Sequence, residues 1–121
     1  ASNAGKCHAT VKAMIETAWS ESNRTLSLPE AHRWVFQESR CIPWVISPDK
    51  RNWGLLQIDP TTVLTTGARL LDPQFNLRKG FEHLDWLATI FGTKEQALTR
   101  YAWGIGAPIT TGEYARKILN P

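Results

Sequence analysis

Apolar residues recur at helical spacing along most of this chain, and this pattern restricts the fold more than any other feature. The clearest stretch places apolar side chains at positions i, i+3, i+4, i+7 and i+8, which share one side of a helix. These residues are Val11, Met14, Ile15, Ala18 and Trp19. No repeat or low-complexity tract interrupts the pattern, and 121 residues suit one hydrophobic core better than two. We therefore expect an all-α fold of five to six helices, with residues 1–121 as a single domain.

A capping signal marks the start of the second predicted helix. Ser27 can accept a hydrogen bond from the backbone of Glu30, and Glu30 can reach back to the backbone of Ser27. Pro29 suits the first turn, where a missing N–H does no harm. We expect this helix to end near Arg40, because Pro43 follows.

Similar signals predict four more helices. Ser, Thr and Asp mark the starts because their side chains accept from backbone N–H groups of the first turn, and glycines mark two of the ends. The predicted boundaries are Asp59-Pro60 before a helix over 61–66 and Gly67 after it, a helix over about 74–91 ended by Gly92, a capping box of Thr93 with Gln96, and a capping box of Thr110 with Glu113. Residues 41–59 hold prolines and a glycine, so we expect a long irregular loop or a small hairpin there.

The composition argues against several classes of protein. Hydrophobic residues make up 42% and charged residues 21%, which is globular, and no apolar run approaches the ~20 residues of a membrane span. A net charge of +3 suits attraction to an anionic cell wall or another polyanion, but it is too weak and scattered to indicate nucleic acid. We interpret residues 1–5 as a tag remnant or a disordered end rather than a signal peptide.

The cysteines and histidines do not indicate a metal site. Cys7 and Cys41 lack paired zinc spacing, and they are as compatible with one disulfide as with two buried thiols. The histidines, at positions 8, 32 and 83, are dispersed. We expect neither a metal nor a cofactor.

Glu38 is the first candidate for chemistry. It extends the apolar face of the second helix, after Ala31, Trp34 and Val35, so it should point toward the core or a cleft. A carboxyl group held partly out of water has a raised pKa and can donate a proton near neutral pH, as glycosidic cleavage requires. From helical position alone, however, a glutamate neutralised by an arginine is the more frequent arrangement.

A second candidate is the segment from Gly54 to Pro60. Gly54 permits a positive φ or close backbone approach, and Gln57 offers a donor and an acceptor beside apolar neighbours, as suits a sugar hydroxyl or acetamide. A glutamine that bonds only to local backbone remains the alternative.

The tryptophans divide into two groups. Three fall on or beside apolar helix faces and are assigned to the core, whereas three flank loops where they could pack on the C–H faces of sugars. The first group is Trp19, Trp34 and Trp86, and the second is Trp44, Trp53 and Trp103.

Four segments in order resemble the SLT-type lytic transglycosylase family of the lysozyme-like superfamily. They are Glu38-Ser39-Arg40; Gly54-Leu55-Leu56-Gln57-Ile58 with Pro60 and Thr62; Leu71-Asp72-Pro73 with Asn76, Gly80 and Leu84; and Ala97-Leu98 through Tyr101 to Gly104-Ile105-Gly106, followed by Tyr114. The resemblance covers roughly residues 28–120.

The resemblance implies a lysozyme-like fold and Glu38 as the only catalytic carboxylate. Glu38 would protonate the oxygen between N-acetylmuramic acid and N-acetylglucosamine, and would then deprotonate the muramic acid 6-hydroxyl, which closes a 1,6-anhydro ring. The expected substrate contacts are Ser39, Trp53, Gly54, Leu56, Gln57, Tyr101, Trp103 and Tyr114.

One departure from the family pattern and two further aspartates keep alternatives open. Ala102 stands where the family usually has asparagine, which motivates a glycan-binding module with weakened catalysis. Asp59 or Asp49 could act as a second carboxylate in a water-using muramidase, although Asp59 also suits a capping role before Pro60.

The resemblance also implies partners and a location. We expect peptidoglycan strands as substrate, no nucleic acid, and a monomer. The expected location is the periplasm or cell envelope, or a phage virion delivered to the periplasm, with the chain as part of a larger envelope or virion protein.

Overall fold

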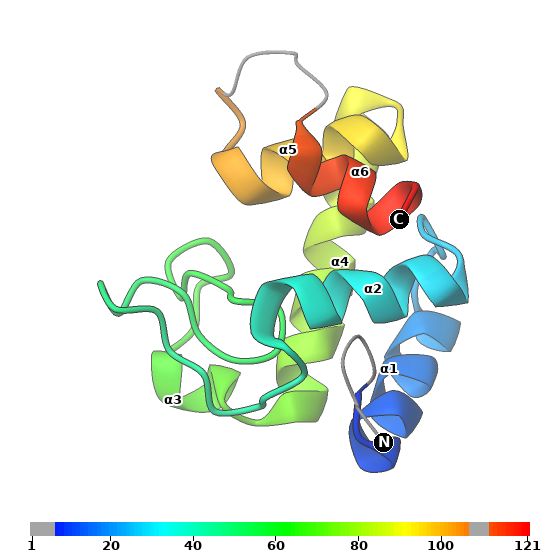
Figure 1. Cartoon of the computed structure of the whole chain (residues 1–121). Helices are drawn as coiled ribbons and strands as arrows, with labels where there is room; N and C mark the ends of the chain where they lie inside the picture. Colours follow the sequence, from blue (N-terminus) through cyan, green and yellow to red (C-terminus); the bar gives the residue numbers. More distant parts are fainter. Residues whose placement is uncertain (1–6, 107–111) are drawn as a thin grey trace.

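The structure, a computed structural model, describes residues 7–106 and 112–121. Within these ranges the chain forms six α-helices and no sheet, which confirms the predicted all-α fold (Figure 1). The helices are α1 (Ala9–Glu21), α2 (Leu28–Ser39), α3 (Gly67–Leu70), α4 (Pro73–Phe91), α5 (Lys94–Trp103) and α6 (Glu113–Leu119).

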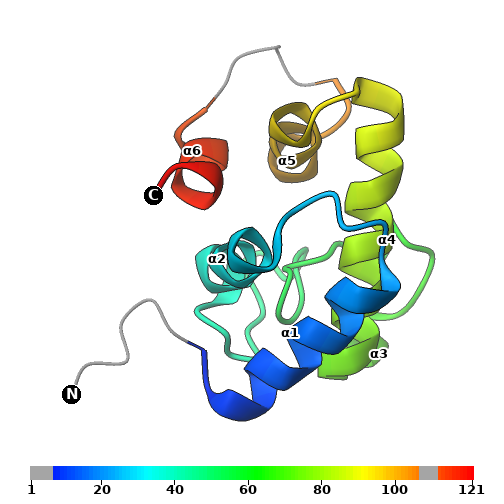
Figure 2. The same cartoon turned by 90° about the vertical axis from the view of Figure 1, so that its right-hand side faces the viewer.

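The long helix α4 organises the packing. It contacts α1, α3 and α5, while α2 contacts α1 and α6, and α5 contacts α6. Figures 1 and 2 both place α2 between α1 on one side and the α5–α6 pair on the other. One apolar core therefore connects all the helices, and it has no separate second centre among the described residues.

Trp34 lies at the middle of this core and is fully buried. Its ring makes edge contacts with Phe81 of α4, at 5.5 Å between ring centroids, and with Tyr101 of α5, at 4.9 Å. Aromatic pairs at such separations prefer edge-to-face geometry. The prediction that Trp34 packs in the core is therefore confirmed, and the residue joins three helices.

The predicted capping box of α2 is confirmed. The Ser27 hydroxyl accepts from Glu30 N at 3.3 Å, and Ser27 N donates to Glu30 Oε1 at 2.8 Å. The end of α4 is also as predicted, because Gly92 takes the left-handed conformation with φ +84°. Only half of the predicted box at α5 forms: Thr93 accepts from Gln96 N at 3.1 Å, but Gln96 Oε1 is buried and has no partner among the described residues.

The predicted helix over 61–66 is wrong, and Gly67 begins a helix instead of ending one. The Asp59 carboxylate accepts from the backbone N and the hydroxyl of Thr61, at 2.9 and 2.8 Å, which stabilises a turn. Leu64 then adopts a positive φ of 54° and breaks any helical path. Thr66, further along, provides the cap of α3.

Two other predictions need correction. Helix α6 starts at Glu113 after Gly112, without a side-chain cap, so Glu113 cannot be the third residue of a capping box; Thr110 lies outside the described residues. Trp86 is 49% exposed and stacks on His83 rather than entering the core. It lies on the solvent side of α4, next to the buried Leu87.

Residues 41–66 form an irregular segment between α2 and α3 (Figure 1). Two isolated antiparallel bridges, Ile46 with Trp53 and Trp53 with Ile58, are its regular pairings, which agrees with the expected small hairpin. No helix within residues 7–106 or 112–121 has the length and apolar character needed to cross a membrane.

Candidate active site

Glu38 sits in the last turn of α2 and lines a cavity of about 270 Å³. The residue is half-buried, as its place at the end of the apolar face predicts. Residues from the irregular segment 41–66, from α5 and from α6 complete the cavity: Asn52, Gln57, Tyr101, Ala102, Trp103 and Tyr114. Because the fold brings one carboxylate into a mostly uncharged pocket, the surroundings of Glu38 control its protonation.

Two side chains connect Glu38 to the core. Trp34 Nε1 donates to the hydroxyl oxygen of Tyr114 at 2.9 Å, and the Tyr114 hydroxyl donates in turn to Glu38 Oε2. The chain of hydrogen bonds runs from the middle of α2 through α6 and back to the end of α2. It fixes the orientation of the carboxyl group and gives the buried indole N–H its partner.

Burial raises the pKa of Glu38 to about 7, against the hydrogen bond from Tyr114, which lowers it. Removing water from around a carboxyl group disfavours its charged form, and here that effect dominates. At neutral pH a large fraction of Glu38 is therefore protonated and able to donate a proton. The arginine-neutralised arrangement is not found, since no salt bridge to Glu38 forms within the described part of the chain.

Asn76 of α4 holds the Gly54–Ile58 segment beside Glu38. Its Nδ2 donates to Trp53 O and Leu70 O, both at 2.8 Å, and its Oδ1 accepts from Leu56 N at 2.9 Å. Gly54 has a φ of +75°, and a Cβ there would collide with the Asn76 amide and Leu70 O. One fully buried amide therefore fixes the shape of this segment, and only glycine fits against it.

The side chain of Gln57 bonds to nearby backbone and also faces the cavity. Its Nε2 donates to Val45 O at 3.0 Å and to Gly54 O at 2.9 Å, as the local alternative predicted. Gln57 nevertheless lines the cavity with Glu38. Since both amide hydrogens are used, the carbonyl oxygen is the atom left to accept from a ligand.

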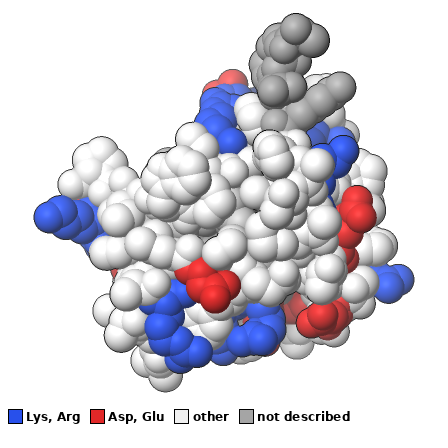
Figure 3. All heavy atoms as spheres, turned by 90° about the horizontal axis from the view of Figure 1, so that it is seen from below, with Lys and Arg blue, Asp and Glu red and all other residues white. Residues whose placement is uncertain are grey.

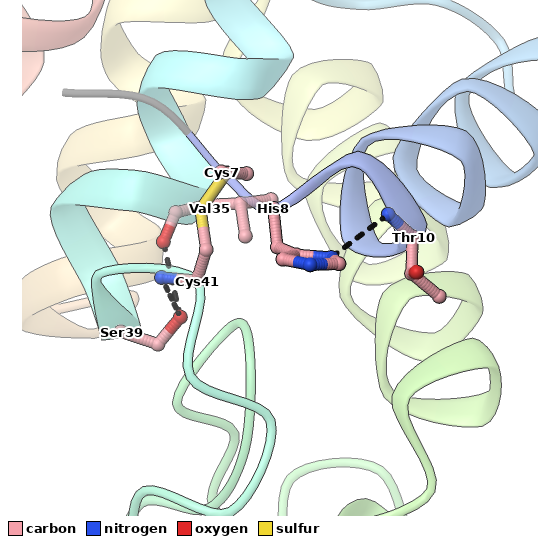
Figure 4. Close-up of a disulfide and its surroundings, with 6 residues drawn as sticks. All are labelled: Cys7, His8, Thr10, Val35, Ser39 and Cys41. Carbon is pink, nitrogen blue, oxygen red and sulfur yellow. Dashed lines mark hydrogen bonds between the residues drawn. A yellow bond between two sulfur atoms is a disulfide. The ribbon is translucent and has the colours of Figure 1, made fainter. Parts of the chain in front are cut away.

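A disulfide between Cys7 and Cys41 decides between the two arrangements open for these cysteines (Figure 4). Cys41 lies two residues after the end of α2, and Arg40 and Cys41 both have positive φ values, of 54° and 63°. The Ser39 hydroxyl donates to Val35 O at 3.2 Å and accepts from Cys41 N at 3.1 Å. The disulfide and Ser39 together fix the reversal of the chain immediately after Glu38.

The predicted contact residues fall into two sets. Gln57, Tyr101, Trp103 and Tyr114 line the cavity with Glu38, and Trp103 is 71% exposed at its edge. The remaining four lie behind or away from it: Ser39 and Leu56 are buried, Gly54 contributes backbone shape, and the Trp53 ring packs on Gly67 while its Nε1 donates to Lys50 O. None of these four lines the cavity of Glu38, so we assign them to shaping it.

Asn52 is a cavity residue that the sequence reasoning missed. It precedes Gly54 by two positions, and side chains two apart in an extended segment share a face. The spacing from Gly54 is therefore the sequence feature that could have indicated Asn52.

A second cavity of about 290 Å³ adjoins the first and shares Asn52, Gln57 and Tyr101 with it. His83 and Asp59 also line it. Burial lowers the pKa of His83, so its imidazole is neutral at pH 7. We refer to these two adjoining cavities together as the groove.

Neither candidate second carboxylate lies in the cavity of Glu38. Asp59 lines the adjoining cavity, stabilises the turn at Thr61 and lies 3.8 Å from Arg51. Asp49 accepts from the Ser47 hydroxyl and from Arg51 N, and the Ser47 bond lowers its pKa. Glu38 is thus the one carboxylate among the described residues that line its cavity.

Charge and metal-ligand patterns add no other site among the residues described. On the face seen from below in Figure 3, Lys and Arg side chains stand in separate groups around a broad uncharged area, with Asp and Glu between them. That face offers no continuous basic stripe for a phosphate backbone. No cluster of three or more His, Cys, Asp or Glu side chains suitable for a metal occurs within 7–106 and 112–121.

Comparisons with known proteins identify the family and the fold of this chain. The sequence profile of the family described as Transglycosylase SLT domain matches residues 18–118. The 70-kDa soluble lytic transglycosylase from Escherichia coli has a similar structure, with a TM-score of 0.68 and 25% identity over 78% of this chain and 17% of that chain. The complex of the 70-kDa soluble lytic transglycosylase with bulgecin A gives the same values.

A third solved structure shares the fold alone. It is an inactive glutamate-to-glutamine mutant of the lytic transglycosylase Slt from Pseudomonas aeruginosa, with a TM-score of 0.66 and 21% identity over 78% of this chain and 17% of that chain. The chain therefore spans less than a fifth of the length of these proteins. Comparison with the curated proteins gives no match.

Proposed function

This chain belongs to the transglycosylase SLT domain family, and from that premise we propose that it cleaves peptidoglycan strands as a lytic transglycosylase. The observation that carries the proposal is the state of Glu38: a half-buried carboxyl group with a pKa of about 7, alone as a carboxylate among the described residues of its cavity. Such a group can donate a proton and take one back at neutral pH.

The first step requires Glu38 in its protonated form. Its carboxyl proton passes to the glycosidic oxygen between N-acetylmuramic acid and N-acetylglucosamine, and the bond from the anomeric carbon to that oxygen breaks. Positive charge then develops on the muramic acid ring. The polar acceptors that line the cavity, such as the Gln57 carbonyl oxygen and the ionised Glu38, favour that charge.

The second step returns the proton. The 6-hydroxyl of the muramic acid attacks its own anomeric carbon, and its proton passes to the Glu38 carboxylate. The product carries a 1,6-anhydro ring, no water is consumed, and Glu38 regains its starting state. One carboxylate serves both steps, so the second carboxylate of a hydrolytic glycosidase is not required.

Two features of the groove support glycan strands as the ligand. Trp103 presents an exposed indole at the edge of the cavity, where a sugar C–H face can pack on it. The adjoining cavity extends the groove beyond Glu38. Ala102 lines the cavity without a polar group, so Gln57 and Asn52 are left to orient the substrate from the opposite segment.

The disulfide supports a cell-envelope or periplasmic location for this domain, since such bonds form and persist in oxidising compartments. We propose that the domain acts there, as part of a larger protein.

Digestion of purified peptidoglycan tests the proposed activity. We expect the wild-type domain to release products with anhydro-muramic ends, and Glu38→Gln to release none, with product masses read by mass spectrometry. Reducing ends, heavier by one water, would show a muramidase instead. Binding of glycan strands by both proteins without any products would show the glycan-binding module that Ala102 motivates.

A further inference from the structure

Two consecutive residues shortly after Glu38 have left-handed backbone conformations. Arg40 caps the end of α2 with a φ of 54°, and Cys41 follows with a φ of 63°. A residue with a Cβ rarely adopts this region, because the Cβ crowds the backbone, whereas glycine enters it freely. A left-handed residue is common where Arg40 stands, at the end of a helix, but Cys41 lies beyond that position. A specific contact must therefore hold Cys41 in this conformation.

The disulfide supplies that contact. Cys41 is buried, and its Cα lies 5.3 Å from the Cα of Cys7. Cys7 packs against the core and directly precedes the cap of α1, where the His8 side chain accepts from Thr10 N at 3.3 Å (Figure 4). The bond therefore ties Cys41 to α1, which packs on α2 and α4.

The turn that the disulfide holds forms the end of the helix that carries Glu38. Cys41 N donates to Ser39 Oγ at 3.1 Å, and Ile42 N donates to Ser39 O at 3.1 Å. An extended conformation at Cys41 would direct both N–H groups away from Ser39 and would break these bonds. The last turn of α2 would then unwind more easily, because the carbonyls at a helix end depend on such partners.

The position of Glu38 depends on that last turn. Its carboxyl group has one hydrogen-bond partner among the described residues, the Tyr114 hydroxyl of α6. A side chain held by one hydrogen bond moves with its own backbone. Unwinding the end of α2 would therefore separate Glu38 from Tyr114 and let water reach the carboxyl group.

We propose that the Cys7–Cys41 disulfide positions the carboxyl group of Glu38: by holding Cys41 in the left-handed conformation, it keeps the last turn of α2 wound and Glu38 in contact with Tyr114. The inference rests on the proposed function of Glu38 and adds two positioning residues to it.

The proposal ties the activity of the domain to the oxidised state of this cysteine pair. The chain has two cysteines, so a dithiol acts on this bond alone. The disulfide takes up two electrons and two protons and becomes two thiols, while the dithiol closes to its own disulfide.

The test separates the bond from the backbone conformation that it enforces. Two double variants lack the disulfide and differ only at residue 41. Alanine in Cys7→Ser, Cys41→Ala disfavours a positive φ, whereas glycine in Cys7→Ser, Cys41→Gly adopts it freely. Oxidised wild type and wild type reduced with dithiothreitol complete the series.

Leu26→Ala is the control for lowered stability. Leu26 is buried just before α2, at the end of the helix opposite to Glu38. The change removes apolar contacts from the core and leaves the turn after Glu38 intact. Thermal melting sets a temperature at which every protein in the series is folded.

The first measurement is a titration of Glu38 by NMR with carbon-13 in the glutamate side chains, which does not depend on turnover. We expect the alanine variant and the reduced wild type to titrate at lower pH than the oxidised wild type. Burial affects the pKa of Glu38 more than the Tyr114 hydrogen bond does, so the entry of water outweighs the loss of that bond. The glycine variant and Leu26→Ala should titrate as the oxidised wild type does.

Other titrating groups do not complicate this measurement. The titratable groups that face Glu38 are Tyr101 of α5 and Tyr114 of α6. Burial raises the pKa of both hydroxyls well above the ordinary value of 10, so neither changes charge in the range where Glu38 titrates.

The second measurement is kcat/KM on soluble glycan strands at pH 7. We expect a fall of at least about tenfold in the alanine variant and in the reduced wild type, because less of Glu38 is protonated and its carboxyl group is displaced. The glycine variant and Leu26→Ala should stay within about threefold of the oxidised wild type.

Three results would overturn the inference. The first is a folded alanine variant with the wild-type titration and kcat/KM. The second is a glycine variant that behaves like the alanine variant, because the conformation of residue 41 would then not be what the bond contributes. The third is a lowered titration in Leu26→Ala, which would make stability alone the cause. If the alanine variant does not fold, the glycine variant is compared with reduced wild type in the same way.

Failure of the inference is distinguishable from failure of the proposed function. If oxidised wild type releases no anhydro ends, the transglycosylase function is wrong, and the titrations of Glu38 still test the role of the disulfide. If oxidised wild type releases anhydro ends and all the proteins titrate alike, only the positioning role is wrong.

Discussion

At the scale of single residues, Glu38 donates one proton, so the pH dependence of cleavage should report the protonation state of Glu38. Cleavage needs the protonated carboxyl group, whose pKa lies at about 7. We expect kcat/KM on soluble glycan strands to fall about tenfold per pH unit above pH 7, because the acid is lost. A rate that stays flat up to pH 9 would show that another group supplies the proton.

Tyr114 should tune that pH limit. Its hydroxyl donates to Glu38 and favours the ionised form, so Tyr114→Phe should raise the pKa of Glu38 and move the fall in kcat/KM to higher pH. The variant also leaves the buried Trp34 N–H without its partner, which should lower the free energy of unfolding by about 1–3 kcal/mol. Parallel pH–rate profiles and denaturant unfolding of both proteins check the two effects, and a fall at unchanged or lower pH would contradict this role of Tyr114.

Glu38→Gln should gain stability at high pH while it loses activity. The folded state raises the pKa of Glu38 from its ordinary value of 4.5 to about 7, so it binds the proton more tightly than the unfolded chain does. Wild-type stability therefore falls as the pH rises through this window, by roughly 3–3.5 kcal/mol at most. Glutamine carries no charge, so we expect the variant and wild type to match near pH 4 and the variant to be the more stable at pH 8. If wild type and Glu38→Gln were equally stable at both pH values, burial would not disfavour the ionised form of Glu38.

At the scale of the elements, Asn76 joins α4 to the segment that faces Glu38. Asn76→Ala would leave Leu56 N, Trp53 O and Leu70 O without the partners that Asn76 gives them. We expect a loss of about 3 kcal/mol in the free energy of unfolding and faster hydrogen exchange at Leu56 N. The matched control is Asn120→Ala, which makes the same change at the exposed end of α6. Wild-type exchange at Leu56 N in Asn76→Ala would rule out this role.

The sequence predicts elements well where local chemistry decides them. The capping box of Ser27 with Glu30 and the glycine end of α4 depend on neighbouring residues and were predicted correctly. The segment over 61–66 was not, because the Asp59 side chain can start a turn as easily as a helix. Trp86 satisfies the helical period, but α4 has a wider apolar face than the core covers there.

Only part of the candidate site could be predicted from the sequence. Glu38 follows from an apolar stripe that ends in a carboxylate, and Gln57 from its neighbours. The role of Asn76 does not follow in this way, because its three partners come from the chain over 53–70 and meet only after folding. Asn52 likewise becomes a candidate only when two cavities are seen to share it.

At the scale of the whole molecule, the disulfide closes a long loop. Cys7 and Cys41 are 34 residues apart, and the bond ties the start of α1 to the chain just after α2. Closing a loop of this length should stabilise the fold by about 3–4 kcal/mol, chiefly by restricting the unfolded chain. We expect the double variant Cys7→Ser, Cys41→Ser to show that loss in denaturant unfolding. The reduced wild type should match it, and an unchanged midpoint would contradict this contribution.

The indole of Trp34 contacts the rings of Phe81 in α4 and Tyr101 in α5. Its N–H also donates the first of the two hydrogen bonds that connect Trp34 through Tyr114 to Glu38. In evolutionary terms, one codon is under two kinds of selection. A library of variants screened for folding alone would retain this tryptophan, because no other side chain fills the same space. It would thereby preserve part of the environment of the acid before any variant had been chosen for activity.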